Sequence, residues 1–73
     1  MNNAMYILRK KNMNYIQSKL VNQFGLKLCF KNKNERIYKN NEMLITCKNK
    51  YISIFIYNDI GESQAHEIAN QIS

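Results

Sequence analysis

A chain of 73 residues makes one domain, near the lower size limit at which a single core suffices without disulfides, metal or a partner. Hydrophobic residues make up 45%, which excludes compositional disorder, and the lack of proline predicts regular elements with short loops. Two cysteines without a recognisable signal peptide predict a cytoplasmic protein with free thiols. The apolar patch at residues 4–8 is too short for a membrane span and precedes its charges, so no membrane partner is expected.

The net charge of +6 is unevenly distributed along the chain. No acidic residue occurs in residues 1–34, whereas residues 51–73 contain three acids and no lysine or arginine. Phosphate-rich partners are one explanation. A genome with AT-rich codons, which favour Asn, Lys and Ile, and attraction between two packed elements of opposite charge are others.

Residues 12–25 are predicted to form an amphipathic helix. Its apolar positions recur at helical spacing, at Met13, Ile16, Leu20 and Phe24. Asn12 is suited to cap the N-terminus, and Gly25 to end the helix in a left-handed conformation. An earlier start, near Ala4, is the alternative.

Alternating patterns then predict strands. In residues 26–31 one face holds Leu26, Leu28 and Phe30, and the other holds Lys27, Cys29 and Lys31. Residues 35–39 form a shorter candidate strand, with Ile37 directed inward. Residues 42–48 place Met43, Ile45 and Cys47 on one face. Residues 51–57 do the same with Ile52, Ile54 and Ile56, whose β-branched side chains suit a buried face.

A second helix closes the chain, with an apolar stripe at Ala65, Ile68, Ala69 and Ile72. The order α-β-(β)-β-β-α predicts a two-layer α+β fold, in which an antiparallel sheet of three to four strands carries both helices on one face. We expect a single domain over residues 1–73, in which residues 1–11 form either part of the fold or a mobile basic segment. Cys29 and Cys47 fall on opposite faces, which excludes a disulfide between them.

The face of the sheet away from the helices is the candidate binding surface, because no third layer remains in the sequence to cover it. Its proposed partner-binding residues are aromatic and basic: Tyr51, Phe55, Tyr57, Tyr38, Lys27, Lys31 and Lys48. Such a surface suits either a protein interface or a platform on which unpaired bases stack. Two simpler explanations compete: aromatic residues are good strand formers, and residues 5–8 could fold over the patch.

The strand at residues 51–57 has no charge, which would make it an aggregation hazard at the edge of a simple meander. The strand could instead be central in another topology, pair with its copy in a homodimer, or receive a strand from another protein.

No catalytic or metal-binding pattern is evident, so we expect neither an enzyme nor a cofactor. The single histidine, His66, lies beside the apolar stripe of the second helix, and Glu62 and His66 alone are too few for a structural zinc site. No glycine-rich phosphate loop is present.

These patterns favour a small protein that binds another macromolecule through the aromatic and basic sheet face, as an accessory regulator or inhibitor. Size and composition suggest a phage or mobile-element product acting in the host cytoplasm on a defence or nucleic-acid-processing complex. The first alternative is a nucleic-acid-binding protein that uses the basic N-terminal half, chiefly Arg9, Lys10, Lys11 and Lys19. The second is a structural protein that self-associates.

Overall fold

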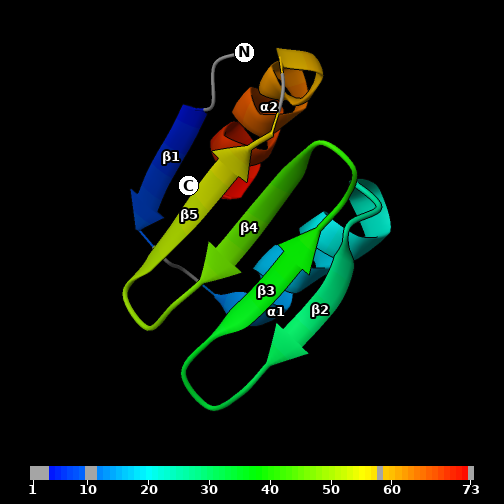
Figure 1. Cartoon of the computed structure of the whole chain (residues 1–73). Coiled ribbons are helices and arrows are strands. Elements are labelled where there is room, and N and C mark those ends of the chain that lie inside the picture. Colours follow the sequence, from blue (N-terminus) through cyan, green and yellow to red (C-terminus); the bar gives the residue numbers. More distant parts are fainter. Residues whose placement is uncertain (1–3, 10–11, 58, 73) are drawn as a thin grey trace.

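A computed structural model describes residues 4–9, 12–57 and 59–72, the first of these ranges as backbone only. It contains one sheet and a layer of helices (Figure 1). The elements are β1 (Ala4–Arg9), α1 (Met13–Gln17), the π-helix η1 (Ser18–Gln23), β2 (Lys27–Lys31), β3 (Arg36–Lys39), β4 (Met43–Cys47), β5 (Tyr51–Ile56), the 3-10 turn η2 (Asp59–Gly61) and α2 (Glu62–Ile72).

All neighbouring strands are antiparallel, in the order β1-β5-β4-β3-β2. The predicted α+β class is confirmed, and from Met13 onward the order of elements matches the prediction. The uncertain strand at residues 35–39 is present as β3. The sheet nevertheless has five strands rather than three to four, because residues 4–9 supply one more.

β1 pairs with β5 over its whole length, from Ala4 opposite Ile56 to Arg9 opposite Tyr51. An earlier start of the first helix near Ala4 is therefore wrong, and residues 4–9 extend the sheet instead of folding over its face. Residues 4–9 thus form a strand of the sheet, while residues 1–3 and 10–11 of the same N-terminal segment lie outside the described chain. β5 is consequently central, with β4 on one edge and β1 on the other. A dimer through strand 51–57 would need a free edge of β5, and both of its edges are paired, with β4 and with β1.

The first helix begins and ends as its sequence predicts. Asn12 Oδ1 accepts hydrogen bonds from the backbone N–H groups of Asn14 at 2.8 Å and Tyr15 at 3.2 Å. Gly25 ends the helix with a φ of 73°, in the left-handed region that glycine tolerates. Between them α1 widens into the π-helix η1, which buries Leu20.

Both helices pack on one face of the sheet, behind the strands in Figure 1. Ile52, Ile54 and Ile56 are buried against this layer, which confirms the predicted orientation of β5. The register places Ile45 opposite Ile54 and Cys47 opposite Ile52 on the same side. The helices contribute six further buried apolar residues: Ile16, Leu20, Ala65, Ile68, Ala69 and Ile72.

β3 has the opposite orientation to the one expected. Tyr38 is paired with the buried Ile45 and is itself fully buried, so it faces the helices. Ile37 is paired with Thr46 on the other side of the sheet and is only partly buried. The inward assignment of Ile37 is therefore wrong, because in a strand a change of register by one residue exchanges the two faces.

A β-bulge in β2 changes the predicted alternation of that strand. The register shifts between Leu28, which is opposite Tyr38, and Phe30, which is opposite Ile37. Because directly opposed residues share a face, Phe30 lies on the side away from the helices, unlike Leu28. Lys31 is opposite Arg36 and lies on the helix side, so its assignment to the binding face is wrong.

Candidate interaction surface

The side of the sheet that faces away from both helices is called here the outer face. No helix of the described chain covers it (Figure 1). By the strand register it comprises Lys27, Phe30, Ile37, Lys39, Leu44, Thr46, Tyr51, Ser53 and Phe55, with Lys48 and Tyr57 just beyond the ends of β4 and β5.

The centre of the outer face is uncharged and largely apolar. Ile37 lies opposite both Phe30 and Thr46, and Leu44 lies opposite Phe55. Phe30 is 46% exposed and Tyr51 is 40% exposed, whereas Phe55 is half-buried. The rings of Phe55 and Tyr57 meet edge to face, with centroids 5.8 Å apart and an interplanar angle of 67°. Aromatic and aliphatic side chains thus form one mixed patch.

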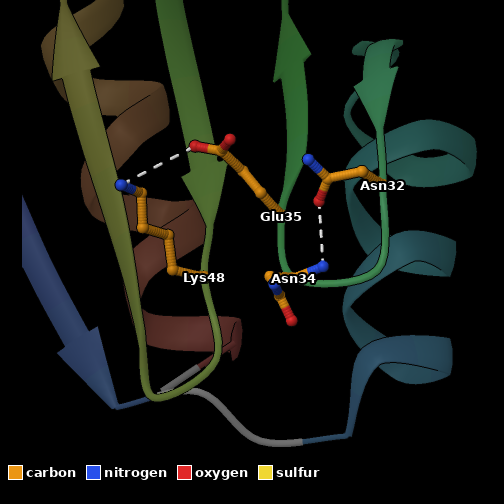
Figure 2. A network of polar contacts seen from close by, with 4 residues as sticks. All are labelled: Asn32, Asn34, Glu35 and Lys48. Carbon is orange, nitrogen blue, oxygen red and sulfur yellow. Dashed lines mark hydrogen bonds and ion pairs between the residues drawn. The ribbon is translucent and has the colours of Figure 1, made fainter.

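One end of the outer face lies where the loops at residues 32–35 and 48–50 meet (Figure 2). Lys48 Nζ lies 3.8 Å from Glu35 Oε2 in an exposed ion pair, and Asn32 Oδ1 accepts a hydrogen bond from the backbone N–H of Asn34 at 2.9 Å. These side chains line an open depression of about 460 Å³ together with Tyr51 and the loop residues. This end therefore has a polar rim of asparagines, two lysines (Lys48 and Lys50) and one acid, Glu35.

The opposite end of the outer face lies where β2 and β4 begin and β3 and β5 end. Lys27 and Lys39 are directly opposite each other in the strand register and line an open depression of about 630 Å³. The other lining residues are Gly25, Cys29, Asn40, Asn41 and Tyr57. Since no acid lines this depression, the net charge of its lining residues is positive.

The structure brings together five of the predicted partner-binding residues, namely Tyr51, Phe55, Tyr57, Lys27 and Lys48. Tyr38 and Lys31 lie on the helix side, for the reasons of register given above. Sequence reasoning missed Phe30, Ile37 and Lys39, which the register places on the outer face. The alternation of residues in the sequence did not predict their positions, because a bulge and a one-residue shift of register both depend on the neighbouring strand.

Of the four residues named for the nucleic-acid alternative, Lys19 is the one whose side chain the structure describes. Lys19 belongs to the helical layer, where Nζ donates to Gln23 Oε1 at 3.0 Å and lies 5.5 Å from the centroid of the Tyr15 ring. Arg9 ends β1, opposite Tyr51, and its side chain is not described. Lys10 and Lys11 fall outside the described residues. Lys27 lies on the outer face, across the sheet from the layer that holds Lys19.

A polar contact on the helix side explains the burial of Tyr38. Its hydroxyl donates to Gln17 Oε1 at 2.8 Å, and Arg36 Nη1 donates to the same oxygen at 2.8 Å. Burial raises the pKa of the Tyr38 hydroxyl above its ordinary value of 10.0, and the neighbouring Arg36 partly opposes this effect. The arrangement is structural, since it satisfies buried polar atoms between a helix and the sheet.

The described residues bring no chemical groups together in a catalytic pattern. His66 is exposed on α2, and no group of three His, Cys, Asp or Glu side chains in the described ranges could hold a metal ion. Cys29 is exposed and Cys47 is buried, and no disulfide joins them in the described chain. None of the described helices has the length and apolar character needed to cross a membrane.

Comparison with protein-family models, curated proteins and solved structures yields no match for this chain.

Proposed function

We propose that this chain is a small, non-enzymatic binding protein that attaches to another protein through its outer face. The arrangement of that face supports the proposal: an uncharged aromatic and aliphatic centre lies between two polar ends that carry lysines. Protein interfaces have this organisation, with charged residues depleted from the core and retained at the rim. A binding protein of this size would act as an accessory regulator or inhibitor by occupying a surface that its target needs.

The geometry favours a protein partner over single-stranded nucleic acid. Stacking platforms present ring faces to successive bases and track the backbone with a row of cations. Here Phe55 and Tyr57 engage each other edge to face, and the lysines lie at the two ends with an uncharged centre between them. Of these lysines, Lys48 is already paired with Glu35.

The composition supports one biological setting. The small size of the chain and its abundance of Asn, Lys and Ile favour a product of a phage or mobile element. In that setting the partner would be a component of a host defence or nucleic-acid-processing complex.

The test is affinity capture of the tagged full chain from its native host, followed by binding assays with the purified candidate partner. Phe55→Ser removes an aromatic group from the outer face. Val21→Ser, on a helical position that is 36% exposed, is the matched control. We expect Phe55→Ser to weaken binding at least about tenfold, as loss of an interface aromatic does, and Val21→Ser to leave it unchanged.

Nuclease treatment and salt separate the competing functions. A protein interface should survive nuclease and respond weakly to salt, whereas binding to phosphates should fall steeply as salt rises. Loss of the captured partner on nuclease treatment would overturn the proposal in favour of nucleic-acid binding. Equal binding by the Phe55 and Val21 variants, or a dimer that Phe55→Ser dissociates, would also overturn it, the latter in favour of self-association.

A further inference from the structure

The depression at the Lys27 and Lys39 end of the outer face has an electrostatic imbalance within the fold. The two residues are directly opposed on adjacent strands, where like charges destabilise a sheet. In the described chain neither Lys27 nor Lys39 forms an ion pair. The ion pair found among the described residues joins Lys48 to Glu35, at the other end of the outer face. Two lysines therefore line one depression that has no acid among its lining residues.

The loop beside these lysines is held in place. Asn40 Oδ1 accepts hydrogen bonds from the backbone N–H groups of Glu42 and Met43, each at 2.9 Å. Asn40 Nδ2 donates to Gln64 Oε1 on α2 at 3.3 Å. The wall of the depression is thus fixed to both layers of the fold, and the two lysine ammonium groups are left as its charged donors.

From this geometry we infer that the depression binds the carboxylate of an acidic side chain on the partner protein, and that this contact orients the partner on the outer face. The inference rests on the proposed function. Lysine ammonium groups are strong donors to carboxylates, and an anion between them would relieve their mutual repulsion. Tyr57 also lines the depression and contacts Phe55, so the charged contact adjoins the apolar centre.

A protein carboxylate fits this position better than a nucleic-acid backbone. A strand of nucleic acid presents phosphates in a continuous row, and binding it needs cations along its whole path. On the outer face the cations at this end are followed by an uncharged centre that includes Leu44, Thr46 and Ser53. A partner protein that presents one acidic side chain next to apolar side chains would complement this arrangement.

The experiment uses the purified full chain and needs no knowledge of the partner. Blocked tetraglutamate, blocked tetraglutamine and a short oligothymidylate are each titrated at constant ionic strength while backbone amide NMR shifts are recorded. We expect tetraglutamate alone to shift the amides of Lys27, Lys39 and Tyr57 in a saturable way. The double variant Lys27→Gln/Lys39→Gln should lower the apparent affinity roughly fivefold or more.

The double variant Lys33→Gln/Lys50→Gln is the matched control, because it removes the same two charges from exposed turns at the other end of the sheet. The control should bind tetraglutamate as the unmodified chain does. No saturable shift at the depression, or an equal loss of affinity in the control variant, would overturn the inference. Tighter binding of oligothymidylate would overturn the carboxylate assignment in favour of a phosphate site.

The same variants separate this inference from the proposed function. If the captured partner binds the double variant as tightly as it binds the unmodified chain but fails to bind Phe55→Ser, the outer face is the interface and the lysine site is wrong. If Phe55→Ser binds normally, the proposed function is wrong, whatever the peptide titration shows.

Discussion

The hydroxyl of Tyr38 donates a hydrogen bond to Gln17 Oε1 at 2.8 Å, from a fully buried position in β3. This contact joins β3 to α1, from which η1 and β2 separate it in the chain. Arg36 donates to the same oxygen, so one glutamine satisfies two donors from one strand. The contact also identifies which side of β3 faces the helices, and with it which residues remain on the outer face.

Tyr38→Phe should lower the free energy of unfolding by about 1 kcal/mol, because it removes this hydrogen bond and leaves the ring in place. Tyr38→Ala should cost about 3–5 kcal/mol, since it also leaves a cavity. Tyr51→Ala, at a position on the outer face that is 40% exposed, should cost no more than about 1 kcal/mol. Urea unfolding followed by circular dichroism measures all three. Similar losses for the two alanine variants would contradict the orientation of β3.

The raised pKa of Tyr38 predicts a specific loss of stability at alkaline pH. The folded chain holds the hydroxyl proton more tightly than the unfolded chain, whose tyrosine titrates near 10.0. Stability from this group is thus fully present below pH 10 and falls as the pH rises through the folded pKa. The difference in unfolding free energy between the unmodified chain and Tyr38→Phe should shrink above pH 10. A constant difference from pH 8 to pH 11 would show that the pKa is not raised.

The two faces of β5 predict opposite consequences for neighbouring substitutions. Ile54→Ser should unfold the domain or cost more than about 3 kcal/mol, because it removes a buried side chain and places a hydroxyl in the core. Phe55→Ser should keep the fold, with a smaller loss, because Phe55 is half-buried on the outer face. Thermal unfolding and amide NMR spectra compare them. A stable Ile54 variant beside an unfolded Phe55 variant would reverse every facial assignment.

The two glycines should resist substitution for different reasons. At Gly61 an added Cβ would lie 2.8 Å from Glu42 Cβ and 3.3 Å from Ile56 Cγ2, so Gly61→Ala should cost about 1–3 kcal/mol through steric overlap. At Gly25 an added Cβ meets nothing within 4 Å, but φ is +73°. Gly25→Ala should cost about 1–2 kcal/mol through backbone strain.

Asparagine distinguishes the two causes, because it tolerates the left-handed conformation better than alanine does. The melting temperature of Gly25→Asn should exceed that of Gly25→Ala, whereas Gly61→Asn should melt no higher than Gly61→Ala. The reverse order at either position would contradict the assigned cause.

Much of the fold follows from local patterns. Asn12 and Gly25 bound the first helix because a side-chain cap and a residue tolerant of positive φ are requirements of the helix ends themselves. The alternation of Ile52, Ile54 and Ile56 indicates the buried side of β5, since only one of its two faces is continuously β-branched. The candidate surface was predictable to the same extent: Tyr51, Ser53 and Phe55 are the remaining residues of β5, and Tyr57 directly follows it.

Three features depend on contacts between segments distant in sequence. β1 forms because the central strand β5 has a second edge to fill, and residues 4–9 alone carry little periodicity. The face of β3 is decided by Tyr38 reaching Gln17. The position of Phe30 on the outer face follows from a bulge against β3. The sequence by itself thus determined the elements and the core side of β5, through local periodicity and capping. Only tertiary structure decided the strand register, because the stability of a register depends on the side chains of both paired strands. A shift of one residue exchanges the faces of a strand.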